Sequence, residues 1–539
     1  MTILVDRRDA MRSLAALGAA GSLPLLGACE SGDGAGAGAG TDAGTQDANA
    51  SPPPEYSYTG ELGPETLFVH GVASGDPLAD RVILWTRVSL PAAELGGPAV
   101  QVFYEVARDE AFADRVAAGE VTADAEHDWT CKVDAAGLKA ATTYWFRFRF
   151  RGRSTVIGRT RTAAATGGER LQLGVASCAS FGSGYFTGYG HLAKRLDLDA
   201  ILHLGDYIYE YGGNPDAERY AAPPHECKTV QDYRTRYAAH RGDADLQEAH
   251  RVHPFVCVWD DHETVNNAWN GGAPSHNEAE DGPWPTRRDA AWRAWRDWLP
   301  ARIAEPGKIW RKLTFGGLCD LWMLDTRIWG RSKQTTPSKA AERADPDRGF
   351  LGPDQEAWLL DGLATTTAKW QVLGQQVMFA PLSLNGTPIN TDQWDGYKAT
   401  RERVLAAARA AKLPGFVILT GDIHTSWAND IVEDSKDAAS YDPKTGKGAI
   451  GAEFVVPGIT SGGFGNLGPE IGGLAKQYNP HIRWNDLLHR GYGVLDLRPD
   501  RAEFRWWLLQ GIDKRGLPES LGAAFAVKHG APGLTKLES

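Results

Sequence analysis

The chain has 539 residues, which is more than one domain of ordinary size, and 42% of them are hydrophobic, which is ample for a large core. Its formal net charge of −11 argues against a nucleic-acid-binding groove, because contact with a phosphate backbone needs clustered lysine and arginine. Six cysteines are too few in a chain of this length for a disulfide framework. Composition therefore indicates a large globular protein, and we expect two folded units.

The N-terminus has the pattern of a targeting segment. Arg7 and Arg8 precede an apolar run at residues 14–26, which is too short to span a bilayer comfortably. The residues that end at Cys29 resemble a bacterial lipobox, whose cysteine is lipidated after cleavage. The paired arginines resemble a twin-arginine signal, but the positions after them depart from it, so twin-arginine (Tat) and general secretory export both stay open. We predict that residues 1–29 are a signal peptide.

Residues 30–57 are rich in Gly, Ala, Ser and Pro and cannot bury a core, which predicts a flexible tether. A lipid on Cys29 followed by this tether predicts an exported bacterial protein, periplasmic or on the cell surface. Its contact with the membrane would be through the lipid alone, and a monomer suffices for a tethered protein of this size. The alternative is a cytoplasmic protein with a helical N-terminus.

The first folded unit is expected at residues 58–165. The segments 82–88, 101–106 and 143–150 have the composition of strands, and the last alternates between apolar and polar residues. Turn-rich gaps at short spacing favour a small antiparallel β-sandwich. The segment contains no cluster of acidic, histidine or cysteine residues, so its expected role is structural.

Residues 166–539 show strands that alternate with helices, so the expected fold class is mixed, α/β with α+β character. Helices are expected at 185–196 and 286–299. The expected strands are 171–177, 201–204, 255–259, 318–325, 370–377, 416–420, 453–457, 494–497 and 503–508.

Four of these apolar strands end in side chains that can bind a metal. The endings are Cys178; Asp206 with Tyr209; Asp261 with His262; and Asp422 with His424. One such ending is ordinary turn chemistry, but four are hard to explain in that way. Strands of one sheet bring their ends together, and crowded carboxylates need a cation because they otherwise repel and raise one another's pKa. The pattern predicts a site for several metal ions.

The types of ligand narrow the choice of metal. Thiolate and phenolate suit a transition metal, and phenolate favours Fe(III). Carboxylates and an amide such as Asn266, or Asn267 beside it, suit Ca²⁺ or Mg²⁺. Asp206 lies between these two sets in the sequence and is the expected bridging carboxylate. We predict iron beside calcium, with zinc as the alternative at the thiolate position, although zinc sites rarely include tyrosine.

Motifs that are specific in combination are spread over residues 66–510. They lie at 71–77, 84–87, 176–178, 203–210, 232–234, 259–263, 374–376, 421–424 and 479–482. On these motifs the chain resembles the alkaline phosphatase D (PhoD-type) family of secreted phosphodiesterases and phosphomonoesterases, which are relatives of the calcineurin-like metallophosphoesterases.

The resemblance implies a phosphoric ester hydrolase with a four-layer α/β/β/α metallophosphoesterase domain after the sandwich. It also implies a site with one Fe³⁺ and one or two Ca²⁺ ions. By this resemblance the iron ligands are Cys178, Asp206, Tyr209 and Asp422, the calcium ligands are Asp206, Asp261 and Asn266, and His424 lies close to the cluster.

Hydrolysis needs a proton for the leaving alkoxide, because the cations neutralise the phosphate and activate water but do not protonate the product. His262, beside Asp261, is the candidate general acid, a role that contributes roughly 10²–10⁴-fold. The alternative is that His262 only orients Asp261. Glu210 and Glu263 each follow a ligand motif and are candidate partners of the ligands. No Gly-x-Ser-x-Gly elbow is present.

Two further residues have weaker support. Arg234 would contact phosphate or lie on the solvated face of a helix, and His481 would line the cleft or, as we favour, serve a structural role. The competing function is a non-catalytic exported surface protein with a structural metal cluster. Such a cluster would be coordinatively closed and would need no adjacent acid, so His262 favours the enzyme.

Overall fold

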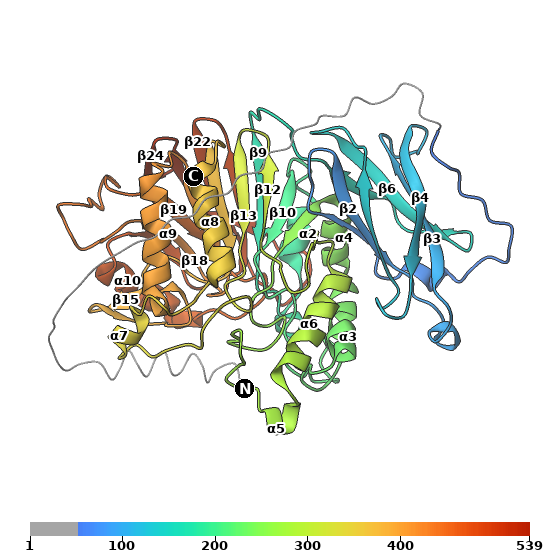
Figure 1. Ribbon diagram of the computed structural model, residues 1–539, viewed down its shortest axis with the longest axis horizontal. Coiled ribbons are helices and arrows are strands. Elements are labelled where there is room, and N and C mark those ends of the chain that lie inside the picture. Colours follow the sequence, from blue (N-terminus) through green and yellow to red (C-terminus); the bar gives the residue numbers. More distant parts are fainter. Residues whose placement is uncertain (1–51, 539) are drawn as a thin grey trace. The chain divides into compact units, whose positions relative to one another are not determined.

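The computed structural model describes residues 52–538 (Figure 1). The predicted signal peptide, Cys29 with its predicted lipid, and the predicted tether up to residue 51 lie outside the described residues. Among the helices of the described range, none has both the length and the apolar character that a membrane crossing requires.

Within residues 52–538, the larger sheet has ten strands drawn from both ends of the chain. In sheet order they are β24 (Ala531–Lys536), β23 (Glu519–Lys528), β22 (Arg501–Leu509), β21 (Gly491–Leu497), β9 (Leu171–Ala176), β10 (Ala200–His203), β11 (Pro254–Cys257), β1 (Val72–Gly75), β2 (Arg81–Arg87) and β5 (Thr130–Ala136). Strands β9, β10 and β11 are parallel and buried at every position, as their continuous apolar sequences predict. Their carboxyl ends therefore share one edge of the sheet.

The second sheet has seven strands in the described part of the chain. In sheet order they are β12 (Arg311–Phe315), β13 (Cys319–Met323), β14 (Trp370–Gln375), β17 (Phe416–Thr420), β19 (Gly451–Val455), β18 (Ser426–Ile431) and β20 (Ile482–Asp486). Strands β13, β14, β17 and β19 are parallel neighbours, so their carboxyl ends also lie together.

The two sheets pack face to face through aromatic side chains. Phe454 of β19 stacks on Phe504 of β22 with ring centroids 4.6 Å apart, and the Trp506 Nε1 donates to the Val455 carbonyl. The alternation along β17 places Val417 in this shared core, while its neighbours face the opposite side of the sheet. The carboxyl ends of two sets of parallel strands are thereby available to one site between the sheets.

Helices cover the outer faces of both sheets. Helices α8 (Pro353–Thr365) and α9 (Lys398–Ala410) lie side by side and pack on the seven-stranded sheet (Figure 1). The buried hydrophobic residues of four others pack with the ten-stranded sheet, and these helices are α2 (Thr187–Ala193), α3 (Val230–Arg241), α4 (Ala244–Val252) and α6 (Trp284–Trp298). The remaining helical segments are α5 (Glu278–Asp281), α7 (Ala340–Arg343), α10 (Gly468–Tyr478), η1 (Glu65–Phe68), η2 (Ala92–Glu94), η3 (Phe181–Ser183), η4 (Trp394–Gly396) and η5 (Gly465–Leu467).

The remaining strands form two small sheets. The five-stranded sheet contains β4 (Arg115–Ala123), β3 (Val100–Ala107), β6 (Thr143–Phe150), β7 (Arg153–Ser154) and β8 (Gly158–Arg161), and the two-stranded sheet contains β15 (Ser383–Leu384) and β16 (Thr387–Pro388). Apolar residues of β3 and β6 pack against β2 and β5 in one buried cluster. The five-stranded sheet, drawn in blue to teal in Figure 1, thus lies on the outer end of the ten-stranded sheet.

Strands β1, β2 and β5 extend the large sheet, which the sequence analysis did not predict. Strand β1 runs parallel to β11, with Ser74 opposite Pro254. The contact is so close that a Cβ at Gly75 would collide with the carbonyl oxygens of Phe255 and Pro300, so only glycine fits there. The strands predicted at 201–204, 255–259 and 416–420 are confirmed as β10, β11 and β17 within two residues.

Candidate metal centre

The backbone at the strand ends adopts a conformation that is costly for residues with a side chain. Cys178, Asp206, Asp422 and His424, which follow β9, β10 and β17, have φ values of 58°, 55°, 59° and 59°. Left-handed residues other than glycine are uncommon and gather at functional sites, because the surrounding structure must offset their strain. Here the strained turns bring side chains from both sheets together.

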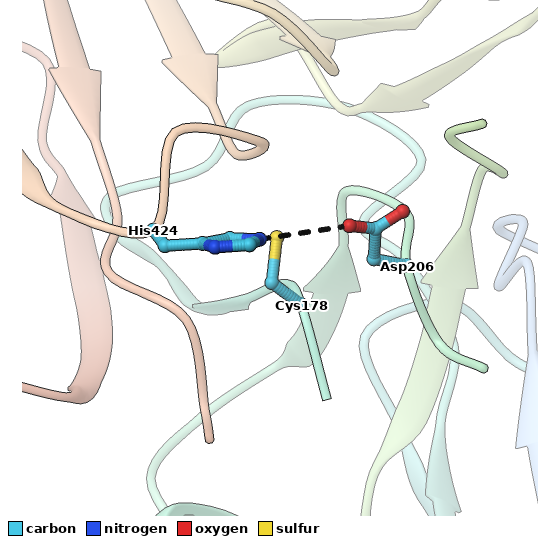
Figure 2. A group of neighbouring side chains, drawn as sticks. All are labelled: Cys178, Asp206 and His424. Carbon is cyan, nitrogen blue, oxygen red and sulfur yellow. Dashed lines mark ion pairs between the residues drawn. The ribbon is translucent and has the colours of Figure 1, made fainter. Parts of the chain in front are cut away.

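The first group of possible ligands contains Cys178, Asp206 and His424 (Figure 2). One ligand atom from each lies within 4.8 Å of the others, and His424 Nε2 is 3.8 Å from Asp206 Oδ2. His424 Nδ1 donates to the Gly462 carbonyl at 3.0 Å, which assigns the proton of the neutral ring to Nδ1. The lone pair of Nε2 is then on the side of the carboxylate and the thiol.

Tyr209 belongs to the same group. Its phenol donates to Asp206 Oδ2 at 2.9 Å and lies 3.1 Å from His424 Nε2, and Ser461 Oγ is 2.6 Å from the phenol oxygen. Burial, together with the charge of Asp206, raises the pKa of both Tyr209 and Cys178 well above their ordinary values. Phenolate and thiolate in this place therefore need a bound cation.

Two more groups overlap in turn, because the second shares Asp206 with the first and the third shares Asp261 with the second. Asp206, Asp261 and His262 form one, and Asp260, Asp261 and Asp422 form the other, each with ligand atoms within 4.8 Å of one another. Burial, followed by the neighbouring aspartates, raises the pKa of Asp206 to about 6 and that of Asp422 to about 7. Asp206 Oδ1 and Asp260 Oδ2 are buried and have no hydrogen-bond donor among the described residues. Buried carboxylate oxygens without a donor fit a cation site.

His262 is paired with Glu210. The His262 Nδ1 donates to Glu210 Oε2 at 2.7 Å, and the other Glu210 oxygen accepts the Asn266 amide at 2.7 Å. The imidazole also packs against the ring of Tyr209, with ring centroids 4.2 Å apart and the rings tilted by 35°. Burial alone would lower the pKa of His262, but Glu210 and then Asp261 outweigh it and raise the pKa well above its ordinary value. The imidazole is therefore held as a cation beside the carboxylates.

Glu263 connects the ends of β10 and β11. Its carboxylate accepts the backbone amides of Asp206, Tyr207 and Asp260 at 3.0, 2.7 and 2.8 Å. Burial, followed by the charge of Asp206, raises the pKa of Glu263 to about 8. Asp261 is fixed in a similar way by the next turn, because its Oδ2 accepts the Asn267 amide at 2.6 Å.

An arginine that the sequence analysis missed lies against three of these carboxylates. Arg327 donates through Nε to Asp260, through Nη2 to Asp422 at 2.8 Å and through Nη1 to Asp392 at 2.6 Å, and Asp261 lies 3.8 Å from Nη2. The side chain has no exposed surface. Arg327 follows strand β13. It therefore also shows the pattern of a polar residue after a buried strand, which pointed to the other candidate ligands.

Two family comparisons cover nearly all of the described chain. Residues 173–506 match the family described as PhoD-like phosphatase, and residues 58–164 match its N-terminal domain. The chain belongs to the PhoD-like phosphatase family. The resemblance stated from the motifs is thereby confirmed, and the chain is a phosphoric ester hydrolase.

Relatives of this PhoD-like phosphatase agree in sequence and in structure. Alkaline phosphatase D of Bacillus subtilis (strain 168) is 37% identical over 494 residues, which are 88% of this chain and 82% of the relative. The solved structure titled "Structure of PhoD" superposes with a TM-score of 0.80 at 35% identity and covers 90% of this chain and 94% of its own. The purple acid phosphatase PPD1 from yellow lupin (Lupinus luteus) seeds shares the fold, with a TM-score of 0.53 at 12% identity over 85% of this chain and 73% of its own.

Two predicted residues of this PhoD-like phosphatase are not brought to the cluster. Arg234 on α3 forms an ion pair with Asp297 at 2.6 Å. His481 Nε2 donates to the Pro381 carbonyl at 2.9 Å. Among the contacts of residues 52–538, neither side chain touches a carboxylate of the three ligand groups. His481 therefore fits the structural role that we favoured. Arg234 is only 6% exposed and paired with Asp297, so it does not lie on a solvated helix face either.

Proposed function

We propose that this PhoD-like phosphatase is a metal-dependent hydrolase of phosphate mono- and diesters that uses cations held between the two sheets and water as the nucleophile. The observation that carries the proposal is the overlap of the three ligand groups. Asp206 belongs to the first and second groups, and Asp261 belongs to the second and third. Shared carboxylates of this kind suit neighbouring cations rather than one isolated ion.

The donor set supports iron beside calcium. Cys178, Tyr209, Asp206 and Asp422 would hold Fe³⁺, and the buried thiol and phenol support this because both resist ionisation without a cation. Asp206 and Asp261, with Asn266, would hold one or two Ca²⁺ ions, and His424 would complete the cluster. When bound, these cations would polarise the phosphoryl oxygens and lower the pKa of water.

His262 is the proposed general acid. The raised pKa of His262 keeps a proton on the imidazole, and this proton can be donated to the leaving alkoxide. Without that proton the alkoxide is a poor leaving group. Glu210 stabilises the imidazolium through the 2.7 Å hydrogen bond to Nδ1, which leaves the proton on Nε2 for the substrate. The neutral imidazole that remains can regain its proton from water, so His262 returns to its starting form.

We also propose how the chain is divided into domains. Residues 58–165 are the accessory β-sandwich, and residues 166–539 are the catalytic domain. Packing of four helices on the ten-stranded sheet and of two on the seven-stranded sheet supports the α/β/β/α order. We assign residues 1–29 to a signal peptide and residues 30–57 to a tether, so the enzyme acts as an exported, lipid-anchored monomer on soluble or surface phosphate esters.

Hydrolysis of bis(4-nitrophenyl) phosphate tests the function. We expect nitrophenol release by purified protein and its loss after metal removal with a chelator, followed by recovery when Fe³⁺ and Ca²⁺ are returned. Activity that persists in protein shown by elemental analysis to be metal-free would contradict the proposal.

The iron assignment has its own test. We expect Cys178→Ser to lose most of its iron and the visible charge-transfer colour of a Tyr209 phenolate, because a serine hydroxyl is a poor replacement for thiolate. Elemental analysis and the absorption spectrum measure both effects. An unchanged iron content would show that Cys178 is not a ligand.

A further inference from the structure

Arg327 contacts carboxylates from both sheets. Asp260 and Asp261 follow β11 of the ten-stranded sheet, whereas Asp422 follows β17 of the seven-stranded sheet. The guanidinium donates to Asp260 and to Asp422 and lies 3.8 Å from Asp261. These are the three members of the third ligand group, so a fixed positive charge already lies where that group would attract a cation.

The position of Arg327 is set independently of these carboxylates. Asp325 accepts the backbone amides of Arg327, Ile328 and Trp329 at 2.8, 2.8 and 3.1 Å, which fixes the turn after β13. Gln376 accepts the Thr326 amide at 3.0 Å and donates to carbonyls on both sheets, those of Trp259 and Leu324, at 2.7 and 2.8 Å. The turn that carries the arginine is thus tied to the ends of both sheets.

The side chain cannot contact a substrate. It has no exposed surface, and its three donor nitrogens are all directed to carboxylates. The nearby aspartates outweigh the effect of burial and raise the pKa of Arg327, so it stays charged. Any effect on the reaction must therefore act through the carboxylates.

We propose that Arg327 is a positioning residue that serves as the built-in counter-cation of the metal-free cluster and holds the carboxylates of the two sheets together until cations bind. Taking several carboxylates out of water without a counter-charge is strongly unfavourable, so the guanidinium stabilises the cation-free fold most. The ligand turns are also fixed by Glu263 and by the Asn267 amide, so the removal of Arg327 changes the local charge more than the ligand positions. This inference rests on the proposed metal-dependent function.

The unequal stabilisation of the cation-free and cation-bound forms by Arg327 has a consequence for cation affinity. If Arg327 stabilises the cation-free form more than the cation-bound form, the folded protein without Arg327 must bind cations more tightly. The usual coupling between two sites predicts a gain of about 5- to 150-fold in affinity.

The test compares Arg327→Gln with Arg331→Gln and Arg327→Lys. Arg331 is a matched control, because it is equally buried and pairs with Asp392, but none of its contacts within residues 52–538 is a hydrogen bond or ion pair with a member of the ligand groups, and only its longer-range charge acts on Asp261. Chelator-treated protein, confirmed metal-free by elemental analysis, is titrated with Ca²⁺ alone in a calorimeter, and urea unfolding is measured before and after metals are returned.

We expect Arg327→Gln to lower the urea midpoint of the metal-free protein more than that of the loaded protein, and to bind Ca²⁺ more tightly than the wild type. Arg331→Gln should lower both midpoints nearly equally and change Ca²⁺ affinity far less than Arg327→Gln, and Arg327→Lys should stay close to the wild type. Equal losses for Arg327→Gln in both states, or unchanged or weaker Ca²⁺ binding, would overturn the proposal.

If Arg327→Gln does not fold without metal, far-UV circular dichroism is followed as Ca²⁺ is added. Recovery of the native spectrum supports the proposal, and a chain that stays unfolded with Ca²⁺ refutes it. None of these measurements uses hydrolysis, so a wild-type protein that fails to cleave esters would end the proposed function without affecting this result.

Discussion

Two buried clusters of charge in this protein have opposite balances. In the five-stranded sheet, Glu105 forms ion pairs with three arginines, with Arg147 Nε at 2.7 Å, Arg115 Nη1 at 3.4 Å and Arg149 Nη1 at 3.8 Å. Between the two large sheets, Arg327 is surrounded by four carboxylates instead. The positive charge around Glu105 exceeds its single negative charge, whereas the carboxylates around Arg327 carry an excess of negative charge that added cations or protons can neutralise.

The largest expected effect comes from the carboxylate that two ligand groups share. Asp206→Asn removes the negative charge common to the first and second groups, and we expect a loss of roughly 10³-fold or more in turnover, since a metal's Lewis-acid contribution of several kcal/mol converts to a factor of that order. Phosphodiester hydrolysis and metal content measure it. Activity within a few-fold of the wild type would show that Asp206 is not a bridging ligand.

His262→Ala should have the second largest effect on turnover, because it removes the protonated imidazole that we propose as the general acid. We expect turnover to fall by about 10²–10⁴-fold for esters with poor leaving groups and less for nitrophenyl esters, with metal content unchanged. A series of esters that differ in leaving-group pKa measures the effect. If all esters slow equally, His262 only orients Asp261.

The metal-free protein should lose stability as the pH rises. The folded-state pKa values of Asp206, Asp422 and Glu263 are raised to about 6, 7 and 8, so the stability linked to their protonated forms is full below their ordinary pKa values near 4 and is lost as the pH rises through 6 to 8. We expect a lower urea midpoint at about pH 9 than at about pH 5 for chelator-treated protein only. The same decline in metal-loaded protein would contradict this view.

The smallest expected effect comes from the charge cluster around Glu105, outside the candidate metal centre. Glu105→Gln should lower the free energy of unfolding by about 1–3 kcal/mol, because the partly exposed arginines lose their shared acceptor but keep contact with water. Urea unfolding measures this loss. Turnover and metal content should not change, and a change in either would mean that this charge cluster also affects the site.

The strand-end pattern indicated which side chains lie close together because it is local, and metal binding by them stays a prediction. Cys178, Asp206 and Asp261 follow β9, β10 and β11, and parallel strands must place such residues on one edge of the ten-stranded sheet. Asp422 follows β17 of the seven-stranded sheet and joins them only because the two sheets pack face to face. The left-handed turns that direct these side chains to the site could not be predicted, because residues other than glycine or asparagine give no sign of a positive φ in the sequence. Cys178, with φ of 58°, is an example.

The strand-end pattern also marks Arg327, which follows β13, but it could not predict the partners of Arg327. Arg327 contacts Asp260, Asp392 and Asp422 across 67, 65 and 95 residues, and the contact with Asp260 exists only because the two sheets pack face to face. Arg234 shows the reverse case, since its motif suggested a phosphate contact but its helix turns it toward Asp297. Residue type alone does not distinguish these two arginines.

The parallel pairing of β1 with β11 has a consequence for any shortened version of the enzyme. Without residues before 166, the main-chain amides and carbonyls of β11 would be left open along a flat, apolar border. Such borders recruit strands from neighbouring molecules, so a trimmed hydrolase would precipitate or self-associate although every metal-binding side chain was still present.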